Sequence, residues 1–176
     1  SQFHCQRGLQ IVAAWREHEL PAVLATGATV VASIWGRQVA DFAAAAEQLA
    51  GVDPRVVAVE VNLSCPNLDG GSHLFAHDPA ATAEVLRAVA GVGLPLWAKL
   101  SANTDRVVEV ASAAQEAGAE AVTLANTMLG MVIDVEARRP VLGGGGGGVS
   151  GPAIHPIAVR TVYDCHAALP ELPIVG

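Results

Sequence analysis

A dense group of polar side chains occupies residues 62–67, with the sequence NLSCPN, directly after an apolar run. The carboxamides of Asn62 and Asn67 offer paired donors and acceptors, which suit the amide or imide edge of a flat ligand. A thiolate at Cys65 could take a proton or attack a carbon atom. The alternative is that Asn62 and Ser64 form only turn hydrogen bonds before Pro66, with Cys65 as a small buried filler.

Lys99 ends a second apolar run, where no solvated helix face is available to it. A buried ammonium needs an acceptor, and a cofactor ring atom that develops negative charge would supply one. The alternative is an ion pair with Glu60 on the neighbouring strand. Both interpretations can hold together, because Glu60 could orient Lys99.

Two further segments carry polar groups that could bind a ligand. Asn126 and Thr127 follow a third apolar run, although a turn or a helix cap would explain them equally well. The glycine-rich residues 143–151 precede Pro152, which predicts a mobile active-site loop whose backbone amides approach a flat or anionic ligand, or else plain loop flexibility. The histidines and cysteines lack metal-ligand spacing, so we expect no metal site.

Composition narrows the class of protein. The 176 residues are 52% hydrophobic and carry a net charge of -7 without a basic cluster, which argues against nucleic-acid binding. Charged residues or glycines interrupt every apolar run before the roughly 18 residues that a membrane span needs. The three cysteines, an odd number at wide spacing, favour a reducing compartment, so we expect a cytoplasmic location.

Apolar runs alternate with helical patterns along the whole chain. Strands are expected at 28–36, 56–67 (with the exit loop included), 94–102, 119–127 and 173–176. Helices are expected at 37–50, 78–92, 104–119 and 151–169, the third of these beginning at Thr104 as its cap. The polar residues all follow strand ends, which converge on one mouth in a barrel but only beside the switch point in an open sheet. We therefore expect an α/β fold, a (β/α)8 TIM barrel. A full barrel takes roughly 250 residues, so residues 1–176 should be the central segment of one barrel domain.

Four motifs in collinear order carry a family resemblance: EVNLSCPN (60–67), WAKLS (97–101), ANT (125–127) and VSGPAIHPIAVRTVYD (149–164). Together they closely resemble the dihydroorotate dehydrogenases, which are FMN-dependent (β/α)8 barrels. The resemblance implies oxidation of (S)-dihydroorotate to orotate, with FMN as hydride acceptor, in pyrimidine biosynthesis.

The resemblance also implies residue roles. Cys65 matches the catalytic base that removes a proton from C5 of dihydroorotate, and a cysteine base is typical of the soluble class 1 enzymes. The positions that match substrate contacts are Asn62, Asn67, Asn126 and Thr127. The positions that match flavin contacts are Lys99, Ser33, Ser150 and Gly151, with Ser33 where the family usually has an asparagine. The family's FMN phosphate loops would lie outside this chain, so we expect the 176 residues alone to be inactive.

The resemblance leaves the electron acceptor and the assembly open. Class 1 members reduce fumarate, or pass electrons to NAD through an iron-sulfur flavoprotein subunit, and we expect a homodimer. One alternative is a related flavin barrel of the dihydropyrimidine dehydrogenase type, which tends to carry histidine where Asn67 stands. The other is a non-catalytic, truncated remnant.

Overall fold

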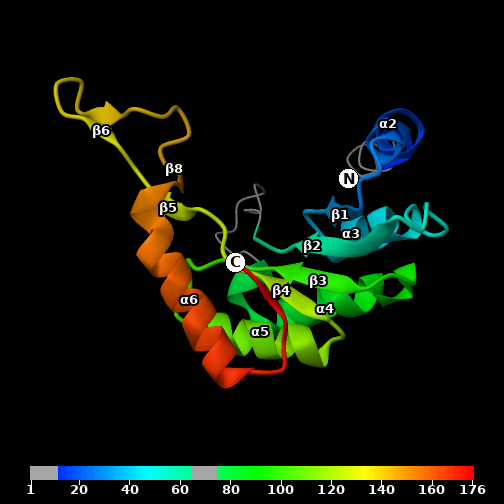
Figure 1. Cartoon of the computed structure of the whole chain (residues 1–176). Coiled ribbons are helices and arrows are strands. Elements are labelled where there is room, and N and C mark those ends of the chain that lie inside the picture. Colours follow the sequence, from blue (N-terminus) through cyan, green and yellow to red (C-terminus); the bar gives the residue numbers. More distant parts are fainter. Residues whose placement is uncertain (1–11, 65–74) are drawn as a thin grey trace.

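The computed structural model describes residues 12–64 and 75–176, in which five parallel strands form the main sheet (Figure 1). These strands are β1 (Val30–Ile34), β2 (Val56–Asn62), β3 (Leu96–Lys99), β4 (Ala121–Thr123) and β9 (Ile174–Val175), and they are neighbours in that order. A doubly wound sheet reverses its strand order at a switch point, whereas strands of an α/β barrel follow one another in chain order. The strand order therefore favours the predicted barrel over the open sheet.

The longer helices form one layer. They are α3 (Val39–Glu47), α4 (Pro79–Val89), α5 (Val107–Glu116) and α6 (His155–Ala168), and each contacts the next. Figure 1 shows α4 and α5 side by side along the strands. The shorter elements are η1 (Trp15–Glu19), α2 (Leu20–Ala25), η2 (Phe75–His77), η3 (Ala90–Val92) and η4 (Pro152–Ile154).

The two faces of the sheet differ in chemistry. Side chains alternate between the faces along a strand, and Val59, Val61 and Ala98 on the helix-covered face are fully buried. The opposite face carries polar side chains, which are Ser33, Glu60, Asn62, Lys99 and Thr123. The core therefore lies between the sheet and the helices, and the opposite face presents polar side chains that could bind a ligand.

The start of α3 is closely packed. Gln38 and Asp41 form a capping box, in which the Asp41 carboxylate accepts from the Gln38 amide at 3.1 Å. A Cβ atom at Gly36 would lie 2.6 Å from the Asp41 Cβ, so this position requires glycine.

The expected start of the next-to-last predicted helix is wrong. Helix α5 begins at Val107 after Arg106, and Thr104 lies before it. The Thr104 hydroxyl accepts from the Arg106 amide at 3.1 Å, so it closes a turn that leads into the helix instead of capping the helix itself.

An antiparallel extension separates β4 from α6. It contains two strand pairs, β5 (Met128–Gly130) with β8 (Gly147–Val149) and β6 (Ile133–Asp134) with β7 (Arg139–Pro140), and it projects away from the main sheet at the upper left of Figure 1. The prediction that the glycine run is all loop is therefore wrong for Gly147 and Gly148. A Cβ atom at Gly148 would lie 2.4 Å from Thr127 Oγ1, so this strand passes Thr127 too closely for any side chain.

Among the helices in the described ranges, none combines the length and the apolar character that a membrane crossing demands.

Candidate active site

Three polar side chains form a continuous hydrogen-bonded chain at the carboxyl ends of β2 and β3. The Lys99 ammonium donates to Ser64 Oγ at 2.9 Å, and Ser64 Oγ in turn donates to Asn62 Oδ1 at 2.7 Å. The Ser64 amide also donates to Asn62 Oδ1, at 3.2 Å. Ser64 is only 1% exposed, so its orientation is fixed by packing and by three polar contacts together.

Asn126, on the loop after β4, joins this hydrogen-bonded chain of side chains. Its Nδ2 atom donates to the Ser64 carbonyl at 3.1 Å, across 62 residues of sequence. The structure thus brings Asn62, Lys99 and Asn126 together at one end of the sheet, as the barrel hypothesis requires.

Glu60 bonds to hydroxyl groups and not to Lys99. Its carboxylate accepts from Ser33 at 3.2 Å and from Thr123 at 2.9 Å, and within the described ranges no ion pair joins it to Lys99. The alternative pairing of Glu60 with Lys99 is therefore wrong, because hydroxyl groups on β1 and β4 hold the carboxylate.

The Glu60 contacts also report the curvature of the sheet. Ser33 lies on the adjacent strand β1, whereas Thr123 lies on β4, two strands away. Two strand spacings amount to about 9.6 Å in a flat sheet. The Glu60 and Thr123 side chains bridge this span to meet at 2.9 Å, which fits a face that is concave at this point. Concavity on the polar face is the geometry of a barrel interior.

Asn103 connects the loop after β3 to the loop after β4, a role that the sequence analysis missed. Its Nδ2 atom donates to Ser101 Oγ at 3.0 Å and to the Thr127 carbonyl at 2.9 Å, while its Oδ1 atom accepts from the Leu129 amide at 2.7 Å. A signal was available: Asn103 closely follows Ser101, itself a polar residue at a strand end.

The remaining predicted residues are less closely tied to this cluster. Ser150 and Gly151 are exposed between β8 and η4, with Gly151 at a φ of 82° that favours glycine. No hydrogen bond links either residue to Lys99 or Asn62 in the described part of the chain. Cys65 and Asn67 lie outside the described residues.

The donor set suits the edge of a flavin ring. A lysine ammonium has three N–H donors, and Lys99 uses one of them on Ser64. Within residues 12–64 and 75–176, two donors therefore remain for ring nitrogen or oxygen atoms that gain negative charge. The Ser33 hydroxyl donates to Glu60, and its oxygen can still accept a hydrogen bond.

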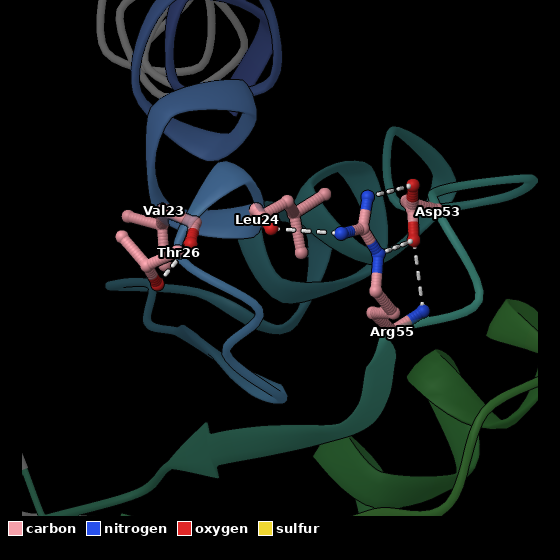
Figure 2. Close-up of polar contacts among 5 residues, drawn as sticks. All are labelled: Val23, Leu24, Thr26, Asp53 and Arg55. Atoms are coloured by element: carbon pink, nitrogen blue, oxygen red, sulfur yellow. Dashed lines mark hydrogen bonds and ion pairs between the residues drawn. The ribbon is translucent and has the colours of Figure 1, made fainter.

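A second polar contact lies at the opposite end of β2, between Asp53 and Arg55. The Arg55 guanidinium binds both carboxylate oxygens of Asp53 at 3.0 Å, and it donates to the Leu24 carbonyl at the end of α2 at 2.8 Å (Figure 2). These hydrogen bonds from Arg55 lower the pKa of the Asp53 carboxyl from 3.8 to about 2. Residues at the amino-terminal ends of barrel strands generally serve stability, and we assign this contact that role.

Comparison with known proteins gives the family. The sequence model described as dihydroorotate dehydrogenase matches residues 5–176. The chain is 47% identical over 158 residues to "Dihydroorotate dehydrogenase B (NAD(+)), catalytic subunit" of Desulforudis audaxviator, which covers 89% of this chain and 51% of that protein. It is 40% identical over 161 residues to the protein of the same name in Bacillus pumilus, covering 91% of this chain and 51% of the relative. The chain thus spans about half the length of these curated relatives.

Solved structures support the same fold. A DHODH from Eimeria tenella, solved in complex with ferulenol, superposes with a TM-score of 0.59 and 16% identity, over 97% of this chain and 50% of that one. The ligand-free form from the same organism gives a TM-score of 0.52 and 19% identity, over 67% of this chain and 38% of that one. With the parallel sheet, the family match and these superpositions, the described part of the chain is an incomplete α/β barrel, and the chain belongs to the dihydroorotate dehydrogenase family.

Proposed function

We propose that this chain is the segment of an FMN-dependent dihydroorotate dehydrogenase that carries the catalytic base and most substrate contacts, within one barrel domain. The enzyme would oxidise (S)-dihydroorotate to orotate in pyrimidine biosynthesis. The observation that carries the proposal is the hydrogen-bonded chain from Lys99 through Ser64 to Asn62, closed by Asn126. It converges on Ser64, which directly precedes Cys65.

Each residue has a distinct part in the proposal. Cys65 removes the proton from C5 of dihydroorotate, for which its thiol must reach the thiolate state. The carboxamides of Asn62, Asn67 and Asn126 hold the pyrimidine ring and its carboxylate, together with the hydroxyl of Thr127. Fixing these groups in advance lowers the entropic cost of orienting the substrate.

FMN, when bound, supplies the atom that accepts the hydride. Lys99 would hold the polar edge of the flavin ring with the donors that Ser64 leaves available. Ser33, Ser150 and Gly151 would complete the flavin contacts. Ser33 is shorter than the family's usual asparagine, so its contact would need a bridging water.

The proposal extends to the assembly. The relatives are named catalytic subunits of an NAD(+) enzyme, which supports a second subunit that passes electrons to NAD; an iron-sulfur flavoprotein would suit that role. A homodimer in the cytoplasm completes the proposal. Sedimentation of the purified protein with and without the second subunit measures both associations.

The test of the proposed function is Cys65→Ser in the full-length protein, assayed by stopped-flow reduction of the bound flavin by dihydroorotate. A serine hydroxyl is a far poorer base at pH 7 than a thiol, so the rate should fall by at least about 100-fold. Cys165→Ala is the matched control, because Cys165 is buried in α6. An unchanged rate in Cys65→Ser would exclude Cys65 as the base.

A further inference from the structure

The Asn126–Thr127 dipeptide is held from three directions. Asn126 donates to the Ser64 carbonyl, on the loop after β2. The Thr127 carbonyl accepts from Asn103, on the loop after β3. The Thr127 side chain lies against Gly148 of β8, where a Cβ atom would come within 2.9 Å of the Thr127 Cβ.

Asn103 makes the central contact of this arrangement. Its amide group uses both ends: Nδ2 donates to Ser101 Oγ and to the Thr127 carbonyl, and Oδ1 accepts from the Leu129 amide. Asn103 therefore binds main-chain atoms on either side of Met128, the first residue of β5. Ser101, which accepts from both the backbone amide and the side chain of Asn103, is fully buried and gives it a rigid support.

The functional groups of the dipeptide stay available to a ligand. Neither Asn126 Oδ1 nor Thr127 Oγ1 forms a hydrogen bond within residues 12–64 and 75–176. The contacts that hold the dipeptide instead use the Asn126 Nδ2 atom and the Thr127 main chain. A segment held in this way, with Asn126 Oδ1 and Thr127 Oγ1 still available to a ligand, is suited to orient a substrate.

We propose that Asn103 is a positioning residue for the substrate. It fixes Thr127, and with it the adjacent residue Asn126, in the orientation that binds dihydroorotate. This inference rests on the proposed function. Asn103 itself need not touch the substrate, because it acts through the Thr127 carbonyl and the Leu129 amide.

The experiment measures orotate binding to the oxidised full-length flavoprotein, by the change in flavin absorbance, together with kcat and KM for dihydroorotate. Asn103→Ala removes all three side-chain contacts, so the orotate Kd and the KM should rise about tenfold. We expect kcat to change by no more than about twofold, because the base and the flavin contacts are untouched. Asn103→Asp keeps the acceptor for Leu129 but loses the donor to Thr127, and it should weaken orotate binding as well.

Thr104→Ala is the matched control on the same loop. It removes the hydroxyl that accepts from Arg106, without contacting the dipeptide. A purely structural role for Asn103 predicts that Asn103→Ala lowers the Tm without changing the orotate Kd. An Asn103→Ala protein that binds orotate as tightly as Thr104→Ala would overturn the proposal.

Gly148→Ala approaches the dipeptide from the other side. The φ of Gly148 is not in the left-handed region, so alanine meets only the clash with Thr127. Displacing Thr127 should again raise the orotate Kd, and an unchanged Kd would overturn the proposal even where Asn103→Ala fails to fold. Wild-type protein that binds flavin but no orotate would overturn the proposed function itself, which separates the two failures.

Discussion

The ammonium of Lys99 donates a hydrogen bond of 2.9 Å to the hydroxyl of Ser64, which stands 35 residues earlier in the chain. The Ser64 hydroxyl in turn donates to Asn62 Oδ1, so the two hydrogen bonds connect the end of β3 to the end of β2. A hydroxyl can donate one bond and accept two, so Ser64 is well suited to stand between a cation and a carboxamide oxygen.

Ser64→Ala should impair the site without abolishing the fold. The change removes the acceptor of Lys99 and one donor to Asn62, and each such contact contributes about 1 kcal/mol. We expect flavin reduction by dihydroorotate to slow about tenfold, since both residues lose their fixed orientation. Ser112→Ala is the control, because Ser112 lies on α5 and bonds only to Glu116 in the described residues. Equal rates in the two variants would contradict the role of Ser64.

The substrate itself is tested by comparing orotate with uracil. Orotate carries a carboxylate that uracil lacks, and a site built for that group loses much affinity when it is missing. We expect orotate to perturb the flavin spectrum at concentrations at least about 100-fold below those of uracil. Preference for uracil would instead favour a barrel of the dihydropyrimidine dehydrogenase type.

Acid should weaken the contact between Asp53 and Arg55. Because folding lowers the pKa of Asp53 from 3.8 to about 2, the contribution of this contact to stability is present above the higher value and is lost as the pH falls toward the lower one. Asp53→Asn should therefore lower the Tm at pH 6, and the difference from wild type should shrink between pH 4 and pH 2. The pair is exposed, so we expect a small effect that salt reduces further.

Thermal scans at several pH values check this prediction. Asp105→Asn, at an exposed carboxylate before α5, serves as the control. A Tm difference for Asp53→Asn that stays constant down to pH 2 would show that Arg55 does not stabilise the fold through the ionised carboxylate.

Cys165 should be unreactive in the folded protein. Burial in α6 raises the pKa of its thiol to about 11, and the side chain is fully enclosed. Since only the thiolate reacts with iodoacetamide, we expect no modification of Cys165 at pH 8 until a denaturant is added. Peptide mass mapping before and after unfolding measures this, and rapid labelling under native conditions would contradict the burial.

The main sheet could be predicted from the sequence because its strands are buried on the helix-covered face and read as apolar runs. All five expected strands are present, with Val59, Val61 and Ala98 at their core. The antiparallel extension could not be predicted in the same way. Its apolar residues are exposed, as Leu129 at 67% and Val135 at 76%, so burial leaves no periodic pattern there.

The position of the site could be predicted from the sequence, but the hydrogen-bond partners of its side chains could not. The rule that polar residues follow strand ends placed Asn62, Lys99 and Asn126 at one mouth. The rule could not predict that Lys99 bonds to Ser64 and not to Glu60, because the partner depends on the curvature of the sheet and on the directions of the side chains. Asn103 was missed although it closely follows Ser101, because two of its three side-chain contacts are to main-chain atoms, which carry no residue-specific signal.

The order of the strands has a consequence for how the chain folds. From β2 onward, each strand of the main sheet pairs with the strand before it in the sheet, as Val59 with Leu96 and Trp97 with Ala121. Each pairing closes one connection that contains a long helix, and the connection from β4 to β9 also contains the antiparallel extension. The entropy lost on closing such loops grows slowly with their length and is similar at every step. Within the described residues, each strand of the main sheet pairs only with the strands next to it in the sheet order. The sheet can grow at one edge in the direction of synthesis, with α4, α5 and α6 each docking on the long helix before it.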